Sequence, residues 1–368
     1  MKIREALDKI KVYGRAYFDE EDSVLYSNYT CGGFGLQFTG KELSVEFEAA
    51  PDTTPPPARG GAPALQQEVW PYAAVFLDGQ EIPDQKLQIK NGSRITLFKS
   101  ETPQRHFVRV VKLTENYRTA LGLREIFVDG ELERPEEKDR EVIEFIGDSI
   151  TCGFGNAAPD AGHEFMAAEE DGWETHGAIA ARALGLEPRF ICVSGISVAR
   201  APEFPDLYGM NELYPYADRI IEDRLSKRRG RGTAGYLPFD FAKKPARYVI
   251  LNLGTNDANQ IYFRKDKGRA LAEFEKNYCD FLSDIRRLNG PDTVIVCALG
   301  CMDYYLFDSI RDIAERYRRE TGDERVFTLK YNKMMNIGPD VGGCLHPSIY
   351  RHRLMAEDLI GFIRDLKL

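Results

Sequence analysis

Several features are missing from this sequence, and each absence excludes a class of protein. No run of about twenty apolar residues occurs, so no membrane-spanning segment is expected. Charged residues occupy the stretch from Met1 to Lys9, where a signal peptide needs an apolar core, and this predicts a cytoplasmic protein. The net charge of −9 disfavours nucleic acid or an anionic membrane as a partner and favours a neutral small molecule or sugar.

Motifs for metals and nucleotides are missing too. No spacing of cysteine and histidine recommends a metal site, and no other cofactor is indicated. The segment Gly153-Phe154-Gly155 lacks the third glycine of a dinucleotide-binding loop and the lysine of a phosphate-binding loop. The seven cysteines form an odd, scattered set, which is typical of reduced thiols rather than of a disulfide framework.

The length of 368 residues and the apolar content of 43% predict two domains. In residues 1–138, short stretches of alternating polarity lie between turn residues, which indicates an antiparallel β-sandwich. Proline and glycine predict a long loop at 51–71, and the charged segment 133–140 marks the domain boundary. The expected strands of this domain are 33–38, 43–47, 73–77, 94–97 and 106–113.

Residues 139–368 alternate between predicted strands and helices, so we expect an α/β domain with a parallel sheet covered on both faces. In such sheets the ligand site lies beyond the carboxyl ends of the strands. The expected strands are 143–146, 190–193, 248–253, 293–299 and 326–329. The expected helices are 168–184, 215–226, 269–288, 306–320 and 348–366.

Ser149 is the candidate nucleophile. It follows an apolar strand, and the glycine at 147 permits a tight turn that would leave the hydroxyl free to attack a substrate. Near the start of a helical turn, free amides and the helix dipole can also help to hold an oxyanion. The sequence is equally compatible with a serine that only caps a helix.

Two residues beyond other predicted strand ends are candidate oxyanion donors. Gly195 can bring its backbone amide close to a substrate oxygen, because it has no side chain to clash. Asn256 can donate its side-chain amide, and Asp257 beside it could brace the loop by accepting amide hydrogen bonds. A tight turn at Gly195 and an Asx turn at Asn256 are the alternative interpretations.

His346 is the candidate general base. It lies in a loop just before a predicted helix cap at Ser348, so its ring can point toward the strand ends. A structural role is the alternative, as for any single histidine. The other four histidines fall in the β domain, in a polar loop or in predicted helices, where packing or surface roles are more usual: His106, His163, His176 and His352.

Together these segments resemble the SGNH (GDSL-like) hydrolases, whose four blocks supply a serine, a glycine, an asparagine and a histidine in that order. The matching residues here are Ser149, Gly195, Asn256 and His346. A β domain of this length, a charged segment and then the sequence of 145–156 are similar to carbohydrate esterase family 2. Those enzymes resemble acetylxylan esterases and remove O-acetyl groups from plant polysaccharides.

The resemblance implies a fold and roles for residues. The fold would be a flavodoxin-like, three-layer hydrolase domain at 139–368, preceded by a jelly-roll-like β-sandwich at 1–138. Ser149 and His346 would be catalytic, and the amides of Ser149 and Gly195 with the side chain of Asn256 would form the oxyanion hole.

One feature departs from the pattern of these families. SGNH hydrolases commonly carry an aspartate two or three residues before the histidine, but here those positions are Cys344 and Gly343. Some members of the resembled family manage with a Ser-His pair whose ring is held by a backbone carbonyl, and we predict that arrangement. Asp340, the nearest preceding acid, is the alternative partner of the ring.

Candidate substrate contacts come from residue type and position. Tyr304 and Tyr305, after the fourth predicted strand of the second domain, could offer a ring on which a sugar face packs, although they could equally line a helix start. Trp70, at the end of the 51–71 loop, is a cleft aromatic by type, and that loop is expected to reach the active site or a neighbouring subunit. Asp148, beside the serine, is the last candidate substrate contact.

The sequence therefore predicts an O-acetyl esterase that acts on acetylated xylo- or manno-oligosaccharides through an acetyl-enzyme, without a metal. A homo-oligomer is compatible with this prediction. A lipase or thioesterase acting on other acyl groups is one alternative, and a non-catalytic carbohydrate-binding protein is the other.

Overall fold

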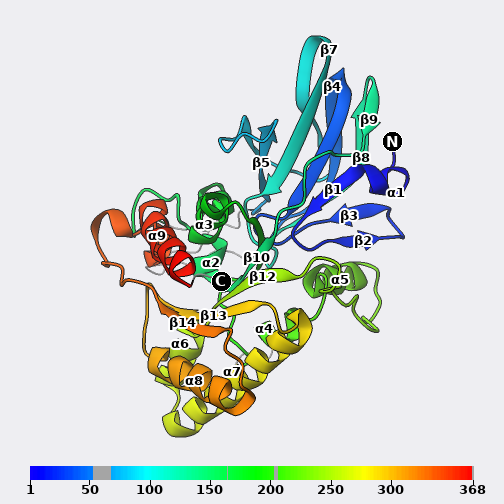
Figure 1. Cartoon of the computed structure of the whole chain (residues 1–368). Helices are drawn as coiled ribbons and strands as arrows, with labels where there is room; N and C mark the ends of the chain where they lie inside the picture. The colour runs from blue at the N-terminus through cyan, green and yellow to red at the C-terminus, as the bar shows by residue number, and fades with distance from the viewer. Residues whose placement is uncertain (53–67, 164, 203–205, 367–368) are drawn as a thin grey trace. The chain divides into compact units, whose positions relative to one another are not determined.

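A computed structural model of the protein describes residues 1–52, 68–163, 165–202 and 206–366. The chain divides into two units (Figure 1). The first consists of Met1–Asp139, Glu164–Gly172 and Asp218–Leu237, and the second of Arg140–His163, Trp173–Ala217 and Pro238–Leu368. The main division thus lies one residue beyond the predicted boundary, whereas two later segments expected in the second domain belong to the first unit.

Buried contacts explain why the segment 218–237 belongs to the first unit. The Asp218 carboxylate accepts a hydrogen bond of 2.9 Å from the side chain of Asn28. Helix α5 (Arg219–Arg228) follows, and its Ile221 and Leu225 pack in one apolar cluster with Tyr26. The helix predicted at 215–226 is therefore present but shifted, and it covers the β unit.

Two long strands form the centre of the first unit, in a single nine-stranded antiparallel sheet. β4 (Gly33–Ala50) unites the strands predicted at 33–38 and 43–47, and β7 (Arg94–Lys112) unites those predicted at 94–97 and 106–113. Irregular registers near Gly40 and Leu43 allow β4 to continue where the sequence suggested a break. The antiparallel β domain is confirmed.

The nine strands are hydrogen-bonded into one sheet because β4 pairs along one edge with β1, β9 and β8 in turn. The full order is β2-β3-β8-β4-β7-β5-β6. Phe34, Leu36 and Phe38, two positions apart on β4, are almost completely buried in its core. The remaining strands are β1 (Ile10–Tyr13), β2 (Tyr17–Asp19), β3 (Val24–Tyr26), β5 (Tyr72–Leu77), β6 (Gln85–Gln88), β8 (Ala120–Val128) and β9 (Glu131–Glu133).

The second unit contains the predicted five-stranded parallel sheet, in the order β11-β10-β12-β13-β14. In order of appearance along the chain this is 2-1-3-4-5, the flavodoxin-like arrangement. Every residue of β10, β11 and β13 is buried, as expected for strands covered on both faces. The strands are β10 (Val142–Gly147), β11 (Glu187–Cys192), β12 (Ala246–Asn252), β13 (Val294–Leu299) and β14 (Val326–Lys330).

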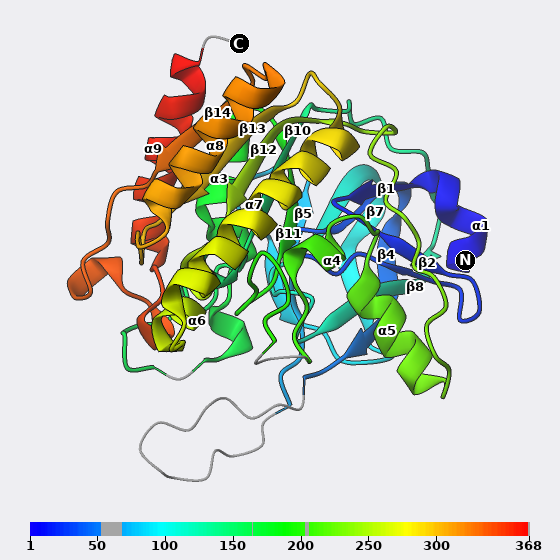
Figure 2. The same ribbon diagram turned by 90° about the horizontal axis from the view of Figure 1, so that it is seen from below.

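Helices cover both faces of this sheet. Figures 1 and 2 show α3 (His176–Leu184) with α9 (Ile349–Asp365) on one side and α6 (Thr255–Phe263), α7 (Lys267–Asn289) and α8 (Phe307–Thr321) on the other. The helix predicted at 168–184 is shorter, because α3 begins after Thr175, whose side chain caps it. No helix in the described ranges is long and apolar enough to cross a membrane.

A buried ion pair lies within the sheet of the second unit. Arg189 on β11 donates to Glu144 on β10 at 2.7 Å, and both side chains are at most 3% exposed. The Tyr214 hydroxyl donates to the second Glu144 oxygen at 2.6 Å. Both carboxylate oxygens of the buried Glu144 therefore accept hydrogen bonds.

Replacing Glu144 by glutamine should destabilise the protein by about 3–5 kcal/mol, because it leaves the Arg189 guanidinium buried without a counter-charge. The exposed pair Arg247–Glu141 offers a matched control, and Arg247→Gln should cost less than about 1 kcal/mol. Urea unfolding of the three proteins measures both changes. Equal losses in the two variants would contradict this assignment.

Candidate active site

The proposed site residues meet at the carboxyl edge of the parallel sheet. The chain order of the strands reverses at β10, between β11 and β12, and ligands of such sheets bind beyond the strand ends at this point. Ser149 follows β10, Gly195 follows β11 and Asn256 follows β12. The predicted convergence of three loops is therefore built into the strand order.

Ser149 and His346 are in direct contact. The Ser149 hydroxyl lies 2.8 Å from Nε2 of His346, and Nδ1 of the same ring lies 3.1 Å from the carbonyl oxygen of Cys344. A carbonyl oxygen only accepts hydrogen bonds, so Nδ1 carries the proton and Nε2 accepts from the serine. This is the tautomer that a general base requires. The predicted carbonyl-held pair is confirmed as a geometry.

The alternative partner, Asp340, is occupied elsewhere. Its Oδ2 accepts a hydrogen bond of 2.6 Å from the amide of Met335. Among the residues that the structure describes, His346 has no hydrogen bond to a carboxylate.

Backbone contacts hold the histidine loop in place. The Gly343 amide donates to the carbonyl of Gly155 at 2.8 Å, and the Ile349 amide donates to the carbonyl of Asn156 at 2.9 Å. Between these contacts, Cys344 adopts a positive φ of 52°, which is uncommon for a residue with a side chain. The strained conformation directs the Cys344 carbonyl at the ring.

His346 is kept neutral by its surroundings. Burial lowers its pKa to about 4, while the hydrogen bond to the Cys344 carbonyl acts weakly in the opposite direction. Nε2 is therefore unprotonated and able to accept a proton at neutral pH.

Asp148 positions the serine and the asparagine instead of binding substrate. Its Oδ1 accepts from the Ile150 amide at 3.0 Å and so caps the short helix α2 (Ser149–Cys152). Its Oδ2 lies 3.4 Å from the side-chain nitrogen of Asn256. Because Asp148 is only 1% exposed, its prediction as a substrate contact is wrong.

Gly195 lies exposed in the loop after β11. A side chain there would meet no atom within 4 Å, so the glycine is required by its φ of +79° and not by lack of space. The Asn256 side chain donates to the Ile196 carbonyl at 3.0 Å, which ties this loop to α6. Within the described ranges, the amides of Ser149 and Gly195 donate no hydrogen bond. These two backbone amides are thus available to an oxyanion, whereas the Asn256 side chain already faces the Ile196 carbonyl and Asp148.

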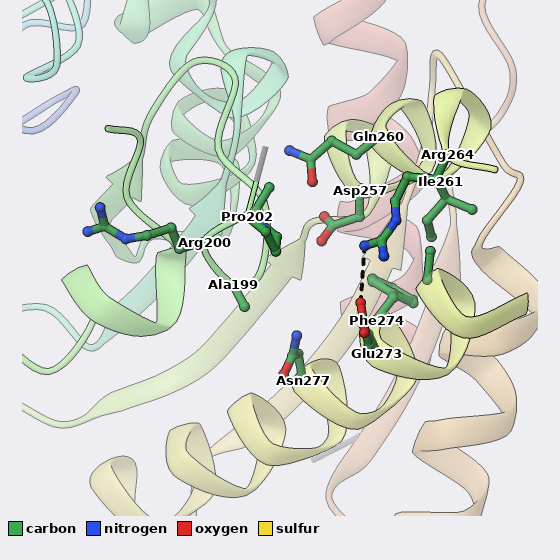
Figure 3. Close-up of a pocket in the computed structure, with 12 residues that line it drawn as sticks. Ala199, Arg200, Pro202, Asp257, Gln260, Ile261, Arg264, Glu273, Phe274 and Asn277 are labelled. Carbon is green, nitrogen blue, oxygen red and sulfur yellow. Dashed lines mark hydrogen bonds and ion pairs between the residues drawn. The ribbon is translucent and has the colours of Figure 1, made fainter. Parts of the chain in front are cut away.

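Helix α6, which the sequence analysis did not predict, braces the glycine loop. The Asp257 carboxylate accepts from the Val198 amide at 3.2 Å, and the Gln260 side chain donates to Ser197 Oγ at 2.8 Å. Asp257, Gln260 and Asn277 are among the residues that line a cavity of about 60 Å³. Figure 3 shows these side chains. Asp257 thus accepts an amide hydrogen bond as predicted, but the amide belongs to the Gly195 loop and not to the loop of Asp257 itself. The spacing of the buried Ala258 and Ile261 was the sequence signal for this helix.

The remaining predicted substrate contacts are Tyr304, Tyr305 and Trp70. The Tyr304 hydroxyl donates to the Tyr331 carbonyl at 2.5 Å, whereas Tyr305 is 58% exposed. Trp70 packs against the core of the first unit, and its indole donates to Glu68 at 3.0 Å. Contact of these three rings with substrate stays a prediction. Most of the 51–71 loop lies outside the described residues.

Sequence reasoning missed one close neighbour of the histidine. The ring of Phe154 lies with its centroid 4.8 Å from that of the His346 imidazole, at an interplanar angle of 49°. Phe154 had been considered only as part of a rejected nucleotide loop, and its position two residues beyond α2 was the available signal.

The two buried aspartates predict a pH-dependent stability. Burial raises the pKa of Asp257 to about 7, with a smaller contribution from the negative charge of Asp148, whereas an unfolded aspartate titrates near about 3.9. The folded state therefore holds this proton more tightly, and stability falls as pH rises from about 4 to 7. Asp257→Asn should be as stable as the wild type at pH ~4 and more stable at pH ~8, by roughly 4 kcal/mol at most.

Urea unfolding at the two pH values measures this difference. Comparison with the wild type cancels the effect of other titrating groups. A stability difference that is the same at both pH values would show that Asp257 is not destabilised by its charge.

Comparisons with known proteins agree with this site. Residues 145–348 match the GDSL-like lipase/acylhydrolase family, and residues 12–135 match the carbohydrate esterase 2 N-terminal domain. The matched ranges include Ser149, Gly195, Asn256 and His346. The fold is also shared with a solved family two carbohydrate esterase from Clostridium thermocellum in complex with cellohexaose. That structure has a TM-score of 0.78 and 23% identity, over 97% of this chain and 98% of that one.

Two characterised relatives are esterases by name. The cellulase/esterase CelE of Acetivibrio thermocellus is 30% identical over 64% of this chain. The match spans only 26% of the length of CelE, about a quarter of that protein. The acetylxylan esterase/glucomannan deacetylase of Cellvibrio japonicus is 24% identical over 73% of this chain and 71% of its own length. With the sequence blocks, the fold and the family match in agreement, this chain belongs to the GDSL-like lipase/acylhydrolase family, and its resemblance to carbohydrate esterase family 2 is confirmed.

Proposed function

We propose that this protein is a serine esterase that removes O-acetyl groups from acetylated plant oligosaccharides. The observation that carries the proposal is the 2.8 Å hydrogen bond from the Ser149 hydroxyl to Nε2 of His346. A nucleophile and a base within hydrogen-bond reach, with the base oriented by a third group, are what acyl transfer requires.

The first half-reaction transfers the acetyl group to the enzyme. Ser149 Oγ attacks the acetyl carbonyl carbon while Nε2 of His346 takes the hydroxyl proton. The negative charge that develops on the carbonyl oxygen is held by the amides of Ser149 and Gly195 and by the side chain of Asn256. When the tetrahedral intermediate collapses, the carbon–oxygen bond to the sugar breaks and Nε2 returns the proton to the departing sugar oxygen.

The second half-reaction releases acetate. Nε2 of His346 takes a proton from a water molecule, which attacks the carbonyl carbon of the acetyl-serine. The bond from that carbon to Ser149 Oγ then breaks, Oγ regains a proton from the imidazolium, and acetate leaves. Throughout both halves, the Cys344 carbonyl keeps the Nδ1 proton in place, so that only Nε2 exchanges protons with the reactants.

The substrate class rests on the relatives and on charge. One relative is named as an acetylxylan esterase and glucomannan deacetylase, and a related family two esterase binds cellohexaose. The net charge of −9 suits a neutral sugar better than a polyanion. Acetylated xylo- and manno-oligosaccharides are therefore the proposed substrates.

Removing the nucleophile should abolish the reaction and leave the fold intact. Ser149→Ala should release acetate from acetylated xylo- and manno-oligosaccharides at least about a thousandfold more slowly than the wild type, with an unchanged melting temperature. Acetate release followed by NMR measures the rate and identifies the acetylated hydroxyl. Wild-type turnover in the Ser149→Ala variant would eliminate the mechanism.

Acyl-chain length separates this proposal from a lipase or thioesterase. The wild type should hydrolyse 4-nitrophenyl acetate much faster than 4-nitrophenyl octanoate, and the reverse preference would favour the alternative. Binding of the oligosaccharide without acetate release would favour a carbohydrate-binding protein instead.

Asp340 and His346 should respond very differently to substitution. His346→Gln removes the base and should lower kcat by at least about a thousandfold, whereas Asp340→Asn should change it by less than about threefold. The asparagine side chain keeps an oxygen that can accept from the Met335 amide. Steady-state kinetics on 4-nitrophenyl acetate compares the two variants. A severe loss of kcat in Asp340→Asn would indicate a Ser-His-Asp triad instead of a Ser-His pair.

A further inference from the structure

The imidazole of His346 is held without help from a charged group. Its Nδ1 donates to a neutral carbonyl, and hydrogen bonds to ionised acceptors are roughly twice as strong as neutral ones. A ring anchored in this way is free to turn about its side-chain bonds unless packing restrains it. The question is which side chain supplies the restraint.

Phe154 lies against the imidazole. The two ring centroids are 4.8 Å apart and the planes meet at 49°, within the range in which aromatic rings attract each other. Phe154 is therefore one of the side chains that can restrain the imidazole by packing.

The backbone fixes Phe154 in this place. Its amide donates to the Ser149 carbonyl at 3.1 Å, so the phenylalanine continues directly from the helical turn that carries the nucleophile. On its other side, Gly155 has a φ of +62°, and a side chain there would come within 3.0 Å of the Gly343 carbonyl oxygen. The turn that holds Phe154 is thus in contact with both the serine helix and the histidine loop.

We propose that Phe154 is a positioning residue for the Ser149–His346 pair. Its ring stops the imidazole from rotating out of line with the serine and keeps water away from it, and so performs part of the orienting work that a carboxylate performs in a triad. This inference rests on the proposed function, because it concerns the same pair of residues.

The groups around the His346 ring determine the direction in which loss of Phe154 should shift the pKa of His346. Ser149 on α2 and the Cys344 carbonyl are uncharged. His352 on α9 stays neutral, because burial and the nearby His176, His346 and Arg351 lower its pKa. Loss of the Phe154 ring admits water, which favours the charged imidazolium and raises the pKa of His346 from about 4 toward the ordinary value of about 6.5.

Three variants test this role. Phe154→Ala should lower kcat for 4-nitrophenyl acetate about two- to tenfold with KM changed less than twofold, the range expected for loss of one aromatic pair. The acid limb of its pH–rate profile should move toward pH ~6.5. Phe154→Tyr keeps the ring and should retain the wild-type profile. Phe154→Leu, which keeps part of the bulk but not the ring, should shift the limb in the same direction as alanine but less far, and it serves as the test if the alanine variant does not fold.

Two controls complete the design. Phe263→Ala removes a phenylalanine that is 77% exposed on α6 and should leave the profile unchanged. NMR titration of the histidine rings, with His346 identified by its absence in His346→Gln, reports the pKa without any substrate. Only five histidines are present, so the spectrum is simple.

The outcomes separate this inference from the proposed function. An active esterase in which Phe154→Ala and Phe154→Leu leave the acid limb and the His346 titration unchanged overturns the inference and keeps the function. If the His346 titration shifts in Phe154→Ala and Phe154→Leu but the wild type releases no acetate, the positioning role is supported and the proposed esterase activity is contradicted.

Discussion

The site depends on one hydrogen bond, from the Ser149 hydroxyl to Nε2 of His346, between residues 197 positions apart in the chain. The 2-1-3-4-5 order of the parallel strands places the loop after β10 at the reversal point of the sheet, and this loop contacts the loop before α9 there. The backbone contacts between 155–156 and 343–349 then fix the two loops to each other. The nucleophile and the base are thus positioned by main-chain geometry, with no ionic interaction between them.

Charge is used sparingly around the reacting atoms. The carboxylates of Asp148 and Asp257 are buried behind the oxyanion donors, where they accept backbone amides and hold Asn256 and the Gly195 loop. Burial raises the pKa of both to about 7, so these groups are costly to fold and rigid once folded. Such a cost is common where a site must be preorganised. His346, in contrast, faces a carbonyl and an aromatic ring, which leave it a neutral base.

The pairing of a histidine with a neutral carbonyl has a consequence for the rest of the site. A carbonyl fixes the tautomer but stabilises the imidazolium less than a carboxylate does. In the proposed mechanism, transition-state stabilisation then comes more from the proposed oxyanion donors and from the exclusion of water. The ring of Phe154 packs against His346, and Asp257 and Gln260 hold the Gly195 loop by hydrogen bonds. Both features are consistent with a site that relies on oxyanion donors and on the exclusion of water. The strained φ values of Cys344 and Leu345 show where the backbone carries the constraint.

The sequence by itself determined the parallel sheet, most of the helices around it, and that Ser149, Gly195 and Asn256 follow strand ends, because buried strands and amphipathic helices have distinct periods. Only the tertiary structure decided the partners. Nothing local indicates that Asp148 is buried against Asn256 or that α5 covers the β unit. Each of these contacts joins elements brought together by the strand order and by packing, which act over distances in the chain that local periodicity does not encode.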